Sequence, residues 1–401
     1  MPLEALSFLT LIGLTIIVGY IGALIFERTR IPDVIWLMVF GLLVSGLGLM
    51  DRSVFMAVSG IMSAVALMMI LFDAGLNMNA TRLVKGMSRG TLLGFSAMFM
   101  SIVVVTAVAL SMQIGLVGGL LLGAILAGTC SPTVIGLVNR LRISEHVKSM
   151  LNIETIVTDP VTVVIAISMI KIMTAEATGW SVVSGIVTAY SVAIMVGLAV
   201  GAAWLLMLQR LRGRPYDYML TMAVLALLYV FVESVGGSGA IASLVFGLVL
   251  GNAMLFSKSF RPEQTDGHMR DFYSQLTFFI RAFFFVFIGL IATLEPTAAM
   301  YGIFISILLI VVRLLATHVS TLGMTMTDTE LNLIRIMGPR GLTAAVLASL
   351  PLAYGIAGGE LMMNITFVVI IATVIYTTLA VRLFYRPPQA RRKDLITRSE
   401  K

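Results

Sequence analysis

Two acidic residues lie in a segment that is otherwise apolar enough to cross a membrane. Residues 151–163 read LNIETIVTDPVTV and contain Glu154 and Asp159. A carboxylate at bilayer depth is energetically costly, so such a residue usually marks a path for a proton or an ion. On a helix the two acids are separated by about 500° of rotation, so they point in different directions and can have different roles. The sequence therefore predicts an ion or proton path at this segment.

The two acids are expected to differ in their partners. Arg340 cannot lose its charge and lies in the middle of another apolar segment, so it needs a carboxylate partner within the membrane. We expect Glu154 to be that partner, in a structural ion pair. No comparable partner is predicted for Asp159, and a buried carboxylate without a partner can exchange a proton near neutral pH. Asp159 is therefore the predicted binding residue, and Thr155 and Thr158 can offer hydroxyl groups on the same helix.

The apolar segment that starts near Gly115, the fifth along the chain, is interrupted at its middle by residues that disfavour a continuous helix. These are Gly128, Thr129, Cys130, Ser131 and Pro132. Proline removes a backbone donor, and irregular backbone at this depth is tolerated only where it faces protein or a wet cavity. Broken helices form ion sites in secondary transporters, and the hydroxyls of Thr129 and Ser131 suit a hard cation. We expect these residues to line the site together with Cys130, exposed to water; a simple proline kink is the alternative.

A second interruption lies in the twelfth apolar segment, where residues 338–341 read GPRG. One broken segment in each half of the chain is typical of transporters built from inverted repeats. No strong residue identity relates the two halves, so the repeat is predicted from position alone.

The composition indicates that most of the chain lies in a membrane. Of its 401 residues, 59% are hydrophobic and only 12% are charged, and the mean hydropathy is +1.03. A spanning helix needs roughly 20 apolar residues, and about thirteen such segments follow one another, which predicts an all-α, multi-pass membrane protein. They start near Ala5, Asp33, Phe55, Gly90, Gly115, Met150, Trp180, Tyr218, Gly239, Phe272, Thr297, Glu330 and Leu361. Residues 5–26 lack the features of a cleaved signal peptide, so we expect them to be a retained span.

The positive charges alternate between successive loops. Lysine and arginine concentrate in the odd-numbered loops, at Arg28, Arg30, Arg82, Lys85, Arg89, Arg140, Arg142, Lys148, Arg210, Arg212, Arg214, Lys258, Arg261 and Arg270. The positive-inside rule then predicts a cytoplasmic C-terminus and, with an odd number of spans, an external N-terminus in the cell (plasma or inner) membrane. We expect a transmembrane domain over residues 1–386 and a short basic tail over residues 387–401. This distribution explains the net charge of +7 without a nucleic-acid partner.

The sequence argues against several classes of activity. It has a single cysteine and three widely spaced histidines, so neither an intramolecular disulfide nor a metal-enzyme site is predicted. The GxxxxGK[ST] motif that would indicate a nucleotide-driven motor is missing from the sequence. We therefore expect a non-enzyme that needs no cofactor and transports its substrate at the expense of an ion gradient.

Three more charged residues lie within apolar segments. Asp73, near the predicted cytoplasmic end of the third segment, is expected to be either an acid on the access route or a helix-end residue near solvent. Arg281 and Arg313 are deep enough to need partners or a wet face, and structural roles are favoured for both.

Five segments together resemble the cation/proton antiporters of the sodium/proton exchanger superfamily. They read LFDAGLNM (71–78), GAILAGTCSPTVIGLVNRL (123–141), IETIVTDP (153–160), FFFVFIGL (283–290) and GPRGLTAAVLASLP (338–351). The resemblance covers nearly the whole chain. It implies that Asp159 binds a cation and a proton alternately and that Thr155 helps to coordinate the ion. It also implies an ion pair between Glu154 and Arg340, and a homodimer formed by a scaffold domain against which a carrier domain moves.

The chain departs from the pattern of that family at two places. Thr158 stands where an Asn or Asp often precedes the key aspartate, and Cys130 and Ser131 replace an aspartate in the broken segment. Because this second carboxylate is missing, we expect electroneutral exchange of one Na⁺, K⁺ or Li⁺ for one proton. A gated cation channel on the same scaffold and an organic-anion symporter are the alternatives, and the acidic centre argues against the symporter.

Overall fold

The computed structural model describes residues 3–29, 31–49, 52–78, 89–138, 141, 143–174, 180–211, 217–253 and 267–384. Every regular element within these ranges is a helix, which confirms the predicted all-α class for the described part of the chain. The helices are α1 (Leu3–Thr29), α2 (Asp33–Gly46), α3 (Arg52–Asn77), α5 (Arg89–Ser111), α6 (Leu116–Ala127), α7 (Ser131–Val138), α8 (Glu145–Thr174), α9 (Trp180–Leu211), α10 (Asp217–Ser234), α11 (Gly239–Gly251), α13 (Gly267–Ile291), α14 (Pro296–Thr321), α15 (Asp328–Ile336), α16 (Leu342–Ala353) and α17 (Gly359–Phe384).

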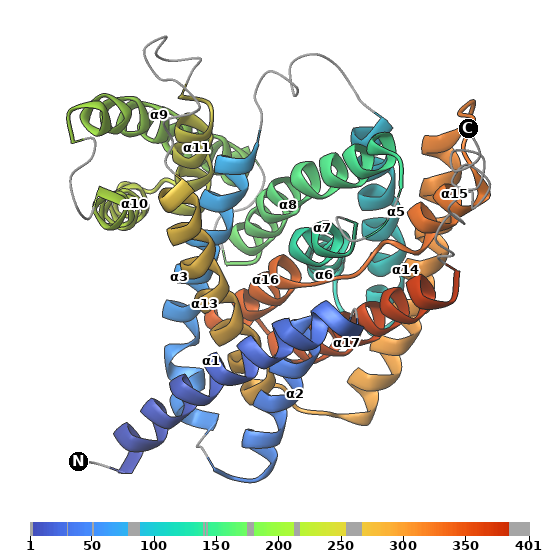
Figure 1. The fold of residues 1–401 in the computed structure, drawn as a ribbon. Coiled ribbons are helices and arrows are strands. Elements are labelled where there is room, and N and C mark those ends of the chain that lie inside the picture. Colours follow the sequence, from blue (N-terminus) through green and yellow to red (C-terminus); the bar gives the residue numbers. More distant parts are fainter. Residues whose placement is uncertain are drawn as a thin grey trace, which may run out of the picture.

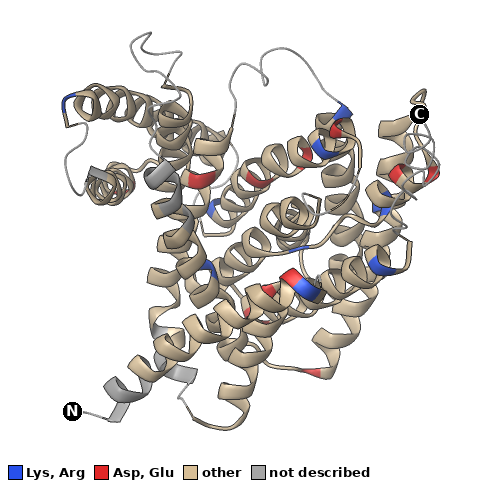
Figure 2. Cartoon of the chain, viewed as in Figure 1, with Lys and Arg blue, Asp and Glu red and all other residues tan. Residues whose placement is uncertain are grey.

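The helices have the length and composition of a multi-pass membrane protein. Eight helical stretches are long and apolar enough to cross a bilayer, and α6 and α7 count together as one of them. Five shorter helices are also apolar. Figure 2 shows long stretches of helix with no acidic or basic residue, as expected for segments that face lipid or each other.

Many of the loop cations that predicted the topology lie outside the described residues. These are Arg30, Arg82, Lys85, Arg140, Arg142, Arg212, Arg214, Lys258 and Arg261, and the whole predicted tail over 387–401 lies outside them as well. The predicted sidedness of the termini therefore stays a prediction.

Both predicted interruptions occur in the structure. Helix α6 ends at Ala127 and α7 begins at Ser131, while α15 ends at Ile336 and α16 begins at Leu342. Gly128 has an extended backbone with φ −72° and ψ 146°, so the helix stops there, and Pro132 cannot donate the hydrogen bond that would continue it. Two short stretches of non-helical backbone are thereby placed inside the helical bundle (Figure 1).

Two pairs of helices approach each other so closely that only glycine fits at the contact. Gly41 of α2 and Gly289 of α13 meet directly, and a Cβ on either residue would collide with the backbone of the other helix. The same relation holds for Gly75 of α3 and Gly247 of α11. Such contacts between small residues let helix backbones pack tightly in a membrane, where dispersion forces drive association.

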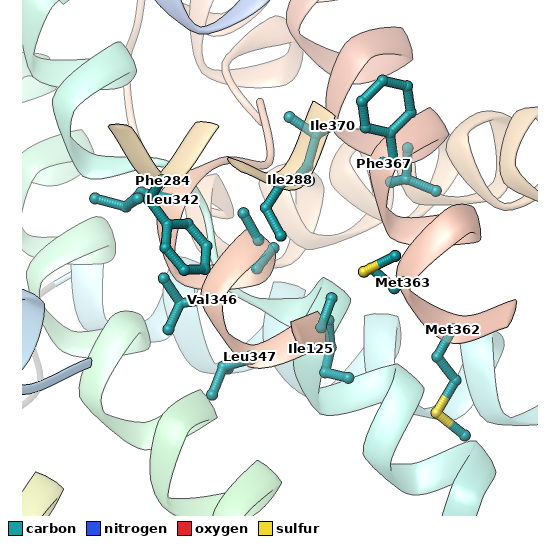
Figure 3. Packing of buried hydrophobic residues seen from close by; sticks show 14 of the residues in the cluster. Ile125, Phe284, Ile288, Leu342, Val346, Leu347, Met362, Met363, Phe367 and Ile370 are labelled. Carbon is teal, nitrogen blue, oxygen red and sulfur yellow. The ribbon is translucent and has the colours of Figure 1, made fainter. Parts of the chain in front are cut away.

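Two groups of neighbouring helices can be distinguished by their packing. Helix α11 packs against α3, α9 and α10, while α5 packs against α6, α8 and α14. In Figure 1, α9, α10 and α11 lie at one side of the molecule and α5, α14 and α15 lie at the other. The main apolar cluster spans both groups, and Figure 3 shows part of it where α6, α13, α16 and α17 meet. The two broken helices therefore lie against a packed apolar layer.

Candidate functional site

The two interruptions contact each other through their backbones. The Cys130 N–H donates a hydrogen bond of 2.8 Å to the Pro339 carbonyl. Gly341 lies directly against Cys130, because a Cβ on this glycine would collide with the Cys130 side chain. Residues about 210 positions apart in the sequence are thus fixed beside each other, and they lie next to α8, which carries both candidate acids.

Arg340 is buried at this junction and binds carbonyl groups. Its Nη1 donates to the carbonyl oxygens of Ala127 at 2.7 Å and Gly128 at 2.8 Å, and its Nη2 donates to Ser101 Oγ at 3.2 Å. The last carbonyls of a helix have no intrahelical partner and bear a partial negative charge. Arg340 therefore satisfies the C-terminal end of α6, whose partial negative charge stabilises the guanidinium. Glu154 also lies within electrostatic range of Arg340.

The predicted ion pair between Glu154 and Arg340 is wrong in its second member. Glu154, which is 1% exposed, pairs with Arg313 of α14. Arg313 Nη1 donates to Glu154 Oε1 and Arg313 Nη2 donates to Oε2 at 3.0 Å, a two-pronged arrangement that fits a carboxylate well. The remaining Arg313 nitrogen, Nε, donates to the Ile334 carbonyl at 2.9 Å. The prediction failed because the carbonyl end of a broken helix can hold a buried arginine as a carboxylate does.

Asp159 has no arginine or lysine partner among the described residues. It is 6% exposed, and Ser131 Oγ donates to its Oδ2 at 2.7 Å, as the predicted site requires. Its Oδ1 is buried and, within the described part of the chain, accepts no hydrogen bond. The Thr343 side chain, at the start of α16, also lies within range of this carboxylate. Asp159 is thus held by hydroxyl groups from both broken helices, with one oxygen left available.

The other predicted ligands have varied surroundings. Thr129 Oγ1 donates to Glu154 Oε1 at 3.5 Å, and the Cys130 sulfur lies 3.1 Å from Thr133 Oγ1. Cys130 is only 4% exposed, so its predicted exposure to water is not found. Thr155 Oγ1 donates to the Asn152 carbonyl at 3.1 Å. Thr158 Oγ1 donates to the Thr155 carbonyl at 3.4 Å, and its methyl group faces Gly94 of α5. The printed contacts therefore bring Ser131 to Asp159 and Thr129 to Glu154, whereas Thr155 and Thr158 bond within their own helix.

The remaining charged candidates have local partners. Arg281 Nη2 donates to Asp33 Oδ2 at 2.7 Å, which joins α13 to the first residue of α2. Asp73 Oδ1 accepts a hydrogen bond of 3.2 Å from Asn77 Nδ2, at the end of α3. The structural role expected for Arg281 thus has a specific partner, and Asp73 lies where a helix-end residue would.

Sequence reasoning missed Arg313 as the partner of Glu154 and Thr343 as a neighbour of Asp159. Arg313 carried a usable signal, since a permanent charge inside an unbroken apolar helix requires a buried partner just as Arg340 does. Thr343 follows the second interruption directly, and its nearness to Asp159 arises only because the two interruptions meet. The site therefore has one acid whose charge is neutralised by an arginine and a second acid without an arginine or lysine partner among the described residues.

Gly341→Ala is expected to destabilise the junction by about 1–3 kcal/mol, the usual cost of overpacking. The added Cβ would lie 2.6 Å from Cys130 Cβ and closer still to the thiol, so the two interruptions must separate. Thermal stability in detergent measures the effect. Gly185→Ala, where the added Cβ meets nothing within 4 Å, is the control. Recovery in Gly341→Ala/Cys130→Gly supports the contact, and an unchanged melting temperature in Gly341→Ala would contradict it.

Comparison with known proteins identifies the family of the chain. A family model described as "Sodium/hydrogen exchanger, transmembrane" matches residues 13–385. The K(+)/H(+) antiporter NhaP of Alkalimonas amylolytica is 25% identical over 393 residues, which cover 93% of this chain and 66% of that protein. The Probable Na(+)/H(+) antiporter 2 of Methanocaldococcus jannaschii is 24% identical over 353 residues, covering 83% and 81% of the two chains.

A solved structure shows the same fold. The sodium proton antiporter MjNhaP1 from Methanocaldococcus jannaschii superposes with a TM-score of 0.77 at 21% identity, over 94% of this chain and all of that one. The chain spans about two thirds of the length of the Alkalimonas relative and 45% of the length of K(+)/H(+) antiporter NhaP2 from Shewanella species. The match extends over both interruptions and both acids, and the chain belongs to the sodium/hydrogen exchanger family of membrane antiporters.

Proposed function

We propose that the chain is a secondary antiporter that exchanges a monovalent cation for a proton by competition at Asp159. The observation that carries this proposal is the contrast between the two buried acids. Glu154 is neutralised by Arg313, while Asp159 keeps Oδ1 free of hydrogen bonds in the described part of the chain. A deprotonated Asp159 would attract a cation, and a protonated one would release it. The transported ion is Na⁺, K⁺ or Li⁺, and no cofactor takes part.

The interruption between α6 and α7 supplies further ligands in this proposal. Arg340 occupies the carbonyls of Ala127 and Gly128, and the Cys130 carbonyl accepts from Val134 N–H at 2.9 Å. The Thr129 carbonyl therefore remains as the backbone ligand that we favour. Ser131 Oγ can rotate from donating to the carboxylate to sharing the cation with it. Thr129 Oγ1, Thr155, Thr158 and Cys130 complete the candidate set around the ion.

Exchange of one cation for one proton follows if Asp159 alone changes its ligand. No net charge then crosses the membrane, so an imposed potential, which is worth about 2.3 kcal/mol per charge per 100 mV, should have no effect on the end point. The measurement is proton flux driven by a cation gradient in vesicles, with and without a potential clamped by valinomycin, using Na⁺ as the exchanged ion. An end point that follows the potential would contradict the one-for-one ratio, and Asp73 would be the next carboxylate to test.

The close glycine contacts support an architecture of two inverted repeats. Gly41 is the ninth residue of α2 and Gly247 the ninth residue of α11, and both follow a Val-Phe pair and precede a leucine. Their partners, Gly289 of α13 and Gly75 of α3, each lie two residues before the end of their helix. We infer that the pair α2–α13 and the pair α11–α3 occupy equivalent positions in two inverted repeats. In this proposal the membrane domain has thirteen spans over residues 1–386, and a basic tail follows over residues 387–401.

During transport, the group of helices that contains the two broken helices (the carrier) would move against the remaining helices (the scaffold). The scaffold helices of two protomers would form a homodimer. We place the C-terminus in the cytoplasm and the N-terminus outside the cell membrane, because the positive charges concentrate in the odd-numbered loops. An organic-anion symporter is less well supported, because Arg281 and Arg313, which could otherwise attract an anion within the membrane, are both paired with carboxylates. A gated cation channel on the same scaffold is separated from exchange by the following experiment.

The experiment that tests the proposed function uses purified protein in vesicles that contain a pH-sensitive dye. Adding Na⁺, K⁺ or Li⁺ outside a pre-acidified vesicle should release the trapped protons, with a rate that saturates as the cation concentration rises. A channel would instead conduct the cation without obligatory proton movement. Proton movement that is absent for all three cations would exclude the proposal.

A further inference from the structure

The Cα of Gly128 lies close to the oxygen of Asp159 that accepts no hydrogen bond in the described part of the chain. A Cβ built on this glycine would lie 3.3 Å from Asp159 Oδ1 and 3.3 Å from Thr162 Oγ1. Two oxygen atoms from α8 therefore approach one point at the end of α6. The backbone of Gly128 is extended, with φ −72° and ψ 146°, a conformation that any L-residue adopts. The chain does not need glycine here for its backbone conformation. The glycine instead avoids crowding, because a Cβ at 3.3 Å would press against both oxygens more tightly than an ordinary van der Waals contact.

The two oxygen atoms beside Gly128 have unused acceptor capacity. Asp159 Oδ1 accepts no hydrogen bond within the described part of the chain, although it is buried. Thr162 is 0% exposed and uses its hydroxyl proton to bond the Asp159 carbonyl at 2.9 Å, so the lone pairs of its oxygen point elsewhere. A buried carboxylate oxygen without a donor is costly in an apolar interior. A desolvated monovalent cation would satisfy it.

We propose that the transported cation binds between Asp159 Oδ1 and Thr162 Oγ1, beside the Cα of Gly128, and that the absence of a side chain at Gly128 sets the preference among Li⁺, Na⁺ and K⁺. The inference rests on the proposed function, since it assigns two further residues to the same site. In the structure Ser131 bonds the opposite oxygen, Oδ2, and so orients the carboxylate before a cation binds. Gly128 is the size-determining residue and Thr162 is a cation ligand.

Two substitutions test the two parts of this proposal. Gly128→Ala adds a methyl group 3.3 Å from both oxygens and so crowds the bound cation. The half-saturating concentration should therefore rise more for K⁺ than for the smaller Na⁺. Thr162→Val keeps the shape of the side chain but removes the oxygen, and it should raise the half-saturating concentration of each cation by about tenfold or more, the scale on which metal sites respond to lost ligand interactions. Thr162→Ser restores the oxygen and should recover much of the affinity.

A matched control separates loss of a ligand from loss of a buried threonine hydroxyl. Thr366 of α17 is 1% exposed and donates to the Met362 carbonyl at 2.8 Å, so Thr366→Val removes a comparable helix-internal hydroxyl away from Asp159. Half-saturating concentrations for Li⁺, Na⁺ and K⁺ are measured in vesicles at one fixed pH for all variants. Thermal stability is measured in parallel. If Gly128→Ala does not fold, the comparison of Thr162→Val with Thr162→Ser decides the assignment by itself.

The outcomes distinguish this inference from the proposed function. Unchanged half-saturating concentrations in Gly128→Ala or Thr162→Val, together with loss of exchange in Asp159→Asn, would overturn the inference and leave the proposed function standing. An equal rise in the half-saturating cation concentration in Thr162→Val and Thr366→Val would also overturn the inference, because the effect would then come from the loss of any buried threonine hydroxyl. Exchange that persists in Asp159→Asn would overturn the proposed function and the inference with it.

Discussion

Asp159→Asn is expected to abolish cation/proton exchange while the protein stays folded. The amide keeps the size of the carboxyl group and can still bond Ser131, but it neither binds a proton near neutral pH nor attracts a cation. Because Asp159 is the buried acid without an arginine or lysine partner in the described structure, no other described group can replace it at this position. Dye-loaded vesicles with Na⁺ and K⁺ gradients measure the loss.

The control for this experiment changes an exposed carboxylate that has no proposed part in transport. Glu145→Gln alters an acid at the start of α8 that pairs with Lys148, and it tells whether the loss of any carboxylate stops exchange. The melting temperature and gel-filtration profile of Asp159→Asn should match those of the unmodified protein. Exchange at more than a small fraction of the unmodified rate in Asp159→Asn would exclude this residue as the competing site.

Removing either member of the Glu154–Arg313 pair is expected to cost about 3–5 kcal/mol of folding stability, because it leaves an uncompensated buried charge. Both side chains are almost fully buried, at 1% and 5% exposure, so water cannot replace the missing partner. Glu154→Ala and Arg313→Ala should each lower the melting temperature far more than Asp159→Asn does. The Glu154→Ala/Arg313→Ala double variant should be much less unstable than the sum of its parts.

A second double-variant cycle tests the pairing itself. Arg340 bonds the carbonyl end of α6, so Arg340→Ala combined with Glu154→Ala should show a far smaller coupling energy than the Glu154–Arg313 cycle. A strong coupling to Arg340 and near additivity with Arg313 would restore the pairing that the sequence suggested. Stability is followed by thermal unfolding in one detergent at one salt concentration for all variants.

The sequence alone predicted the parts of the fold that depend on local chemistry. Long apolar runs predicted spanning helices, and Gly128 and Pro132 predicted the end of one helix and the offset start of the next. The identity of the partner of Glu154 depended on how distant segments pack, which no spacing rule reveals. Arg313 and Arg340 gave equal signals, and only the position of the α6 carbonyls distinguishes them.

The proposed internal repeat is supported by a short match between the sequences of α2 and α11. Residues 39–44 read VFGLLV and residues 245–250 read VFGLVL, and both contain the glycine at which two helices touch. Apolar residues are so frequent in this chain that a short match carries little weight by itself. The match supports the proposed repeat because Gly41 and Gly247 each lie where a Cβ would collide with the backbone of a neighbouring helix. Thr343 and Thr162 could not be predicted as neighbours of Asp159, because threonines occur throughout the buried helices.

The most direct test of competition at Asp159 is to count the protons released when the cation binds. Purified protein in weakly buffered detergent solution at a pH near 7 is titrated with Na⁺ or K⁺, and a pH dye reports the released protons. We expect release that saturates with cation concentration, falls as the starting pH is raised, and is absent in Asp159→Asn. Cation binding without proton release, or equal release from Asp159→Asn, would contradict the account.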